Sequence, residues 1–262
     1  MVKKNTVAGH RKRLRERFLK SGLTGFHDYE IIELLLTLGF PRRDCKPQAK
    51  EVLRRFKTLR GTLAASLEEL REIKGIGPHS VFGIKLVQEV ANEFLRQKVI
   101  DKPVYKTGRE IFEYLYHSMR DLKAELFKVI YLNGRNQIIE IDDLFEGTVN
   151  ASSIYPREVM KAAIKNGAVS LILVHNHPSG DPEPSKYDKD VTRDLVFAGN
   201  IMRIKVLDHI IIGNDRYYSF ASQGLIEEYE ADFLSFRTTG TAEARRRRYR
   251  ARLPETNLLK PD

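Results

Sequence analysis

The hydrophobic pattern of this chain changes near residue 100, and the change limits the folds that it can adopt. Before that point apolar residues recur every three or four positions, which predicts helices. We expect these helices over residues 14–22, 29–39, 47–56, 67–73 and 79–96. After it, short apolar runs alternate with amphipathic segments, which predicts strands separated by helices. We expect strands over 126–132, 137–145, 169–175, 204–213 and 216–220, and helices over 108–121, 155–167 and 186–200.

Three regions follow from this pattern. Residues 1–100 are expected to form an all-helical domain, and residues 101–224 an α/β (α+β) domain with a mixed sheet. A chain of 262 residues is long enough for both. Within residues 225–262, the segment 238–255 has little apolar content and an arginine cluster at 245–248, so this region is predicted to be a flexible or weakly helical basic tail.

The charge is divided as unevenly as the hydrophobic pattern. Residues 1–100 carry 21 Lys and Arg against 11 Asp and Glu, which accounts for the whole net charge of +10. Nucleic acid is the expected polyanionic partner, and a merely solvated basic surface is the alternative. The single cysteine excludes a disulfide framework, and no apolar run reaches the roughly 20 residues of a membrane span. A cytoplasmic protein with no membrane association is the expectation.

A glycine turn joins two of the predicted helices in the basic region. Gly75, Ile76 and Gly77 lie between them, with Lys74 before the turn and His79 after it. Glycines allow close backbone approach, and the N-terminus of the following helix favours a phosphate oxygen. The segment resembles the helix-hairpin-helix of DNA-binding proteins, which would contact backbone phosphate without regard to base sequence. A protein-interaction module or an ordinary turn between two helices remains the alternative.

The strongest chemical signal lies at the end of the apolar strand 169–175. His175 and His177 are two residues apart, so both rings are expected on one side of the strand. A loop rich in proline follows, and then Ser185 and Asp188 at the start of a helix. Two imidazoles and one carboxylate would form a three-ligand zinc site with a fourth position open. As an alternative, Ser185 and Asp188 could simply cap the helix.

The arrangement His175-x-His177, then Ser185-x-x-Asp188, resembles the JAMM signature of the JAB1/MPN metalloprotease domain. The surrounding sequence over roughly residues 9–224 is similar to the RadC family in particular. The resemblance implies a cytidine-deaminase-like fold and one Zn²⁺ per chain, held by His175, His177 and Asp188. It also implies that a glutamate acts on the water and that Ser185 stabilises the tetrahedral intermediate.

Glu125 immediately precedes a predicted strand, as the family's glutamate does, so we expect Glu125 in that role. Glu113, Glu140 and Glu146 are the competing candidates. His209 adjoins a run of isoleucines and is interpreted as a hydrogen-bonded histidine of the core.

We therefore expect a zinc-dependent hydrolase of amide or isopeptide bonds that also binds DNA through its first domain. Its substrate would be a protein or peptide. One alternative is a DNA-repair protein whose metal site acts on DNA, since the RadC family is traditionally associated with repair. A non-catalytic DNA-binding module is the other.

Overall fold

The computed structural model describes residues 7–40, 44–147 and 154–250. The chain divides into two compact units, Met1–Lys98 and Val99–Asp262, within two residues of the boundary predicted at residue 100. Among the described residues, no helix combines the length and apolar character needed to cross a bilayer.

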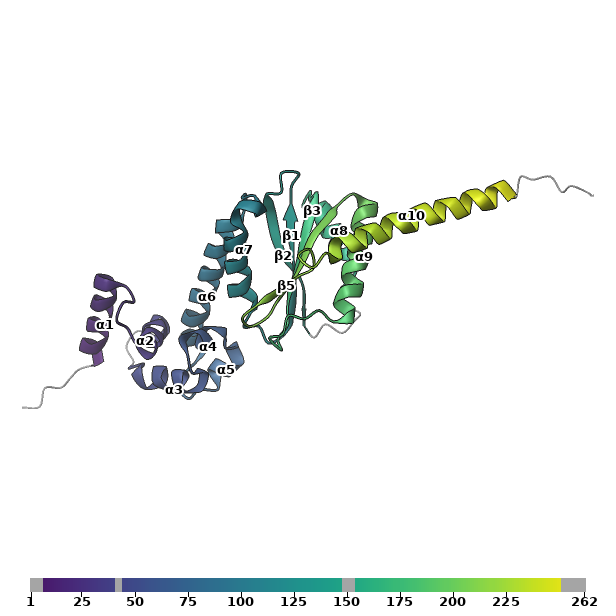
Figure 1. Ribbon diagram of the computed structural model, residues 1–262. Coiled ribbons are helices and arrows are strands. Elements are labelled where there is room, and N and C mark those ends of the chain that lie inside the picture. The colour runs from purple at the N-terminus through teal and green to yellow at the C-terminus, as the bar shows by residue number, and fades with distance from the viewer. Residues whose placement is uncertain (1–6, 41–43, 148–153, 251–262) are drawn as a thin grey trace, which may run out of the picture. The chain divides into compact units, whose positions relative to one another are not determined.

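The first unit is helical, as predicted. Its helices are α1 (Val7–Ser21), α2 (Asp28–Gly39), α3 (Lys46–Phe56), α4 (Leu59–Ala64), α5 (Leu67–Arg71) and α6 (Pro78–Val99) (Figure 1). The short α4 was not expected from the apolar spacing; the Thr58 hydroxyl caps it by accepting from the Gly61 amide. Fully buried side chains from several of these helices, including Ile32, Val52 and Leu70, form one core.

Helices α2 and α6 approach each other closely at a glycine. A Cβ atom on Gly39 would lie 2.1 Å from the carbonyl oxygen of His79, much nearer than two such atoms can pack. Gly39 therefore ends α2 and also makes room for the turn that precedes α6. This contact fixes where the predicted DNA-binding turn lies within its own unit.

The second unit is a mixed sheet with helices on both faces. Its strands are β1 (Glu125–Leu132), β2 (Ile138–Gly147), β3 (Ser170–Asn176), β4 (Lys205–Ile212) and β5 (Tyr217–Ser219), and its helices α7 (Val104–Met119), α8 (Pro156–Lys165), α9 (Lys186–Met202) and α10 (Leu225–Arg250). The strand order is β2-β1-β3-β4-β5, with β3 and β4 parallel and the other pairs antiparallel. Helix α7 lies on one side of the sheet, and α8 and α9 lie on the other (Figure 1).

The apolar strand at 169–175 is central, as its composition indicated. All seven residues of β3 are buried. Alternate residues of β1 and β3, including Phe127, Val129 and Leu173, pack with α8 and α9 in the main core. The opposite face of β1 points to α7, where the Lys128 ammonium lies 5.9 Å from the centre of the Tyr114 ring. The prediction of a helical region followed by a mixed sheet flanked by helices is confirmed.

Of the two forms expected for the tail, flexible or weakly helical, its first part takes the helical one. Residues 225–250 form α10, and Ile226, Tyr229 and Phe233 near its start are buried. These three side chains are spaced by three and four residues, so they form one apolar stripe that packs on the sheet unit. The polar composition farther along hid this short stripe. Residues 251–262 lie outside the described part of the chain.

Candidate metal centre

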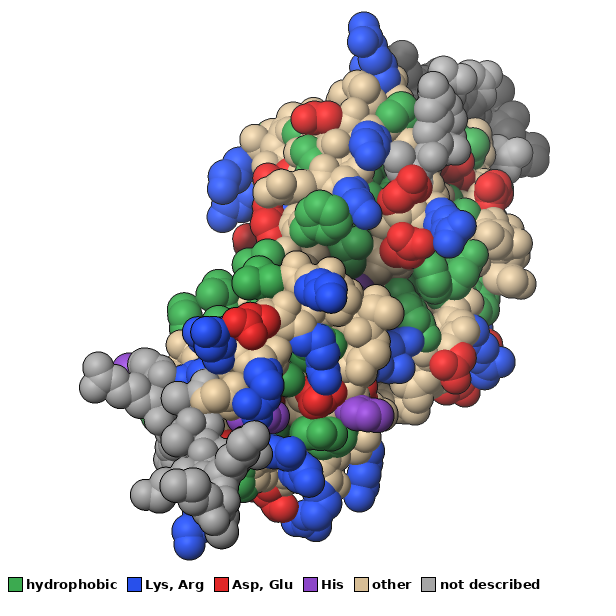
Figure 2. Space-filling model, turned by 90° about the vertical axis from the view of Figure 1, so that its left-hand side faces the viewer, with side chains coloured by type: hydrophobic (Ala, Val, Ile, Leu, Met, Phe, Trp, Pro, Cys, Tyr) green, Lys and Arg blue, Asp and Glu red, His purple; other side chains and the backbone are tan. Residues whose placement is uncertain are grey.

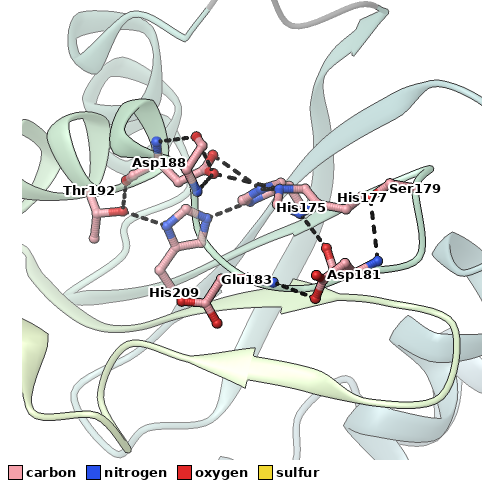
Figure 3. Close-up of polar contacts among 9 residues, drawn as sticks. His175, His177, Ser179, Asp181, Glu183, Asp188, Thr192 and His209 are labelled. Atoms are coloured by element: carbon pink, nitrogen blue, oxygen red, sulfur yellow. Dashed lines mark hydrogen bonds and ion pairs between the residues drawn. The ribbon is translucent and has the colours of Figure 1, made fainter.

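Two elements bring the predicted ligands together: the end of β3 and the first turn of α9. His175 Nε2 lies 3.3 Å from Asp188 Oδ1, and His177 Nε2 lies 3.6 Å from Asp188 Oδ2 (Figure 3). The two Nε2 atoms are 3.0 Å apart. Among the described residues, this is the group of histidine, cysteine and carboxylate side chains with the spacing of a metal site.

The three distances suit a tetrahedral ion. Zinc binds imidazole nitrogen and carboxylate oxygen at about 2.0–2.2 Å, so two ligand atoms of a regular tetrahedron lie about 3.4 Å apart. The two Nε2 atoms are 3.0 Å apart, and they lie 3.3 and 3.6 Å from different oxygens of Asp188, all near that value. His175 and Asp188 are buried, while His177 is partly exposed. The donor set therefore fits zinc and leaves access from the side of His177.

The hydrogen bonds of the two histidines leave the same ring atom facing the centre. His177 Nδ1 lies 2.8 Å from the main-chain oxygen of Asp181, which only accepts, so Nδ1 carries the proton. The neutral ring then presents an unprotonated Nε2. The loop that follows β3 thus holds His177 in the form that binds a cation.

Buried hydrogen bonds that run from Thr192 through His209 orient the His175 ring, and we call them the buried relay (Figure 3). The Thr192 hydroxyl donates to the Asp188 carbonyl, so its oxygen accepts the Nδ1 proton of His209 at 2.6 Å. His209 Nε2 then accepts from His175 Nδ1 at 2.8 Å, so in the neutral ring His175 Nε2 carries no proton. His209 is fully buried, which confirms its interpretation as a hydrogen-bonded core histidine.

Sequence reasoning did not connect His209 or Thr192 with the metal centre. The one available signal was that Thr192 lies one helical turn after Asp188. His209 reaches the site only because β4 lies beside β3 in the sheet.

The electrostatics agree with a cation site. Burial alone would raise the pKa of Asp188, but its contacts with His175, His177 and Ser185 hold this pKa far below its usual value. Burial alone would lower the pKa of His177, but the Asp188 carboxylate, the Asp181 carbonyl and the charge of Glu125 raise it. Burial and the nearby His175 lower the pKa of His209, which is therefore neutral. The low pKa keeps the Asp188 carboxylate ionised, which is the form that binds a cation.

Ser185 has the geometry of a helix cap. Its oxygen accepts from the Asp188 amide at 3.1 Å, and its own amide donates to Asp188 Oδ2 at 2.7 Å. Its hydroxyl also donates to Asp188 Oδ2 at 2.6 Å. The capping interpretation is confirmed, and the same contacts orient the carboxylate. A role in stabilising an oxyanion stays a prediction.

Glu125 begins β1 beside the site. The pairing of β1 with β3 ends at Phe127 and His175, so Glu125 lies two residues beyond the last pair on the strand next to β3. The charge of Glu125 contributes to the raised pKa of His177.

Two of the three competing glutamates, Glu113 and Glu140, lie elsewhere. Glu140 pairs with Tyr131, which is four residues and so about 13 Å along β1 from Phe127. Glu113 binds Arg109 on α7, and the side chain of Glu146 is outside the described part. The general-base role of Glu125 stays a prediction.

The predicted DNA-binding residues form the turn between α5 and α6. Gly75 has φ = 86°, a conformation that favours glycine, whereas a Cβ on Gly77 would meet open space. Ile76 is buried in the helical core, and Lys74 and His79 are exposed. The Gly77 amide donates to the Ser80 hydroxyl at 3.0 Å. Figure 2 shows Lys and Arg side chains spread over one face, interrupted by acidic and apolar ones.

The fold and the site together define a helical unit followed by a JAB-type sheet domain with a candidate His-His-Asp metal centre. Residues 105–225 match the RadC-like JAB domain, and residues 8–82 match the UPF0758 N-terminal domain. The chain belongs to the family of UPF0758 proteins with a RadC-like JAB domain.

Relatives of similar length support this assignment. A UPF0758 protein of Fusobacterium nucleatum is 40% identical over 225 residues, which cover 83% of this chain and 97% of that protein. A UPF0758 protein of Geobacillus kaustophilus is 41% identical over 214 residues, which cover 82% of this chain and 95% of that one. The RadC resemblance of the sequence is therefore confirmed for both units.

Proposed function

We propose that this protein is a zinc-dependent hydrolase of peptide or isopeptide bonds, and that its helical unit binds DNA. The observation that carries the hydrolase proposal is the grouping of His175, His177 and Asp188, whose possible ligand atoms lie within 4.8 Å of one another, with Glu125 at the start of the adjoining strand. His175, His177 and Asp188 would hold the ion. When bound, Zn²⁺ supplies a Lewis acid that polarises a carbonyl and makes water more acidic.

The protein's own groups would then move the protons. Glu125 accepts a proton from the attacking water and passes it to the nitrogen of the leaving amine. Ser185 donates a hydrogen bond to the oxyanion that develops on the carbonyl, a contribution of about 3 kcal/mol. For that step its hydroxyl would turn away from Asp188 Oδ2, the acceptor that it has in this structure.

DNA binding is supported by the charge and by the turn. The first hundred residues hold the whole positive excess of the chain. Exposed Lys74 and His79 flank a turn whose glycines bring the backbone to the surface. Such groups contact phosphate and not base edges, so the binding would be independent of sequence and sensitive to salt.

Hydrolysis of DNA is the second candidate, and the basic helical unit favours it. A single zinc ion is nevertheless more typical of peptidases, whereas many nucleases use two metal ions.

One experiment separates the two candidates. The full-length protein, zinc-loaded or stripped, would be assayed on fluorogenic peptides, on isopeptide-linked lysine substrates and on branched DNA. We expect zinc-dependent cleavage of one of the amide substrates, lost in Glu125→Gln with zinc retained and unchanged in the control Glu140→Gln. Cleavage of DNA alone would favour the second candidate. A zinc-loaded wild type that cleaves none of them would contradict both.

A further inference from the structure

Asn176, the residue between the two histidine ligands, makes two hydrogen bonds that no ligand role explains. Its Oδ1 accepts from the Leu126 amide at 2.8 Å, and its Nδ2 donates to the Ala124 carbonyl at 3.1 Å. The side chain is 1% exposed. Its amide group thus contacts the main chain on both sides of Glu125.

These two bonds take the place of main-chain hydrogen bonds between β1 and β3, which end before this point. The main-chain pairing of β1 with β3 stops at Phe127 and His175. Beyond that pair Asn176 pairs with Ile212 of β4, and the His177 amide donates to the Ile212 carbonyl at 3.0 Å. Like a peptide unit, the Asn176 side-chain amide presents an N–H donor and a carbonyl acceptor. It therefore satisfies the Leu126 amide and the Ala124 carbonyl, which lie beyond the end of the β1–β3 pairing.

We propose that Asn176 is a positioning residue that holds Glu125 against the metal centre. It follows His175 and precedes His177, so one three-residue segment would set both the ligands and the glutamate. This inference rests on the proposed role of Glu125. Proton transfer depends on close geometry, and a misplacement of about 1 Å costs on the order of 100-fold in rate.

The chemistry of Asn176 suggests a graded set of variants. Asn176→Ala removes both bonds. Asn176→Asp keeps an acceptor for the Leu126 amide but sets a carboxylate oxygen against the Ala124 carbonyl. The matched control is Asn133→Ala at the other end of β1, where Asn133 Oδ1 accepts from the amides of Arg135 and Gln137.

The test uses the full-length protein loaded with zinc. Zinc affinity would be measured by chelator competition, amide exchange of the segment 124–128 by mass spectrometry, and kcat and KM on a peptide that the wild type cleaves. For Asn176→Ala we expect zinc affinity within about threefold of wild type, at least about tenfold faster exchange at Leu126, and kcat lower by about 100-fold with little change in KM. Asn176→Asp should show a smaller rise in exchange, and Asn133→Ala should leave all three unchanged.

Several results would overturn the inference. One is wild-type exchange at Leu126 in Asn176→Ala, and another is wild-type kcat despite faster exchange. Loss of zinc from a folded variant would make Asn176 a support for the ligands instead. If Asn176→Ala fails to fold, Asn176→Asp is judged by the same criteria. A wild type without peptidase activity would contradict the proposed function, while the exchange measurement would still decide whether Asn176 holds this strand end.

Discussion

Two helices of this protein, one in each unit, begin with the same local arrangement. In α5 the Ser66 hydroxyl accepts from the Glu69 amide at 3.2 Å, and the Glu69 carboxylate accepts from the Ser66 amide at 2.9 Å. In α9 Ser185 and Asp188 make the same pair of bonds. Each pair satisfies amides that a helix start leaves without partners. Only the second pair faces two histidines.

The difference teaches how a common capping pair becomes part of a candidate metal site. The end of β3 lies beside the first turn of α9, although a loop separates them in sequence. There His175 Nε2 lies 3.3 Å from Asp188 Oδ1. Glu69 belongs to a unit built from helices alone, so no strand end delivers imidazoles to it. The local sequence thus explains why each pair has an acidic residue in the first helical turn. The proposed function of Asp188 depends on the residues that the fold places beside it.

The largest expected contrast is between the two acidic residues of these pairs. Asp188→Ala should weaken zinc binding by more than about 100-fold, because it removes one of three protein ligands. His177→Ala should have the same effect. Glu69→Ala should leave zinc affinity unchanged. Metal content and chelator competition on the full-length protein measure this, and a zinc-loaded Asp188→Ala protein would show that the resemblance to a metal site is only geometric.

The next contrast concerns the buried relay that runs from Thr192 through His209 to His175. His209→Leu fills the same buried position with an apolar side chain and removes the acceptor for His175 Nδ1. Zinc affinity should fall by about 10- to 100-fold, the range for partners that orient a ligand. Thr192→Val should act in the same direction with a smaller effect. The exposed His117→Leu serves as control, and wild-type affinity in a folded His209→Leu protein would contradict the relay.

Substitutions in the helical unit should weaken DNA binding and leave zinc binding unchanged. Lys74→Glu should weaken binding of duplex DNA by about tenfold at low salt and reduce the salt slope by about one. Gly77→Val should also weaken it without unfolding the unit, because a Cβ at Gly77 meets open space. Lys189→Glu, on α9, is the matched control. Equal binding by all of these proteins in a salt titration would remove the DNA-binding role from this turn.

The smallest expected effect compares the two capping serines directly. Ser66→Ala and Ser185→Ala should each lower the free energy of unfolding by about 1 kcal/mol, since each loses one cap. Denaturant unfolding measures this. If Ser185 also stabilises an oxyanion, Ser185→Ala alone should lose about 100-fold in turnover. Equal turnover in the two variants would leave Ser185 as a cap that orients Asp188.

Much of the fold was predictable because its signals are local. The buried strand β3, Ser170–Asn176, was predicted over residues 169–175 from an apolar run, and α9 from its capping pair and periodicity. The first turns of α10 were missed because the polar stretch that follows them, residues 238–255, decided the interpretation of the whole tail. The short α4 was missed because six residues hardly span two helical turns.

For the candidate site, the sequence by itself determined the ligand types and the elements that carry them. His175 and His177 share a face because strands repeat every two residues, and Asp188 lies in a first turn because Ser185 caps it. Only the tertiary structure decided what surrounds them. His209 comes from β4 and Glu125 from β1, and each reaches the centre because its strand is a neighbour of β3 in the sheet. Pairing between strands distant in sequence is set by packing and hydrogen bonds, which no local pattern specifies.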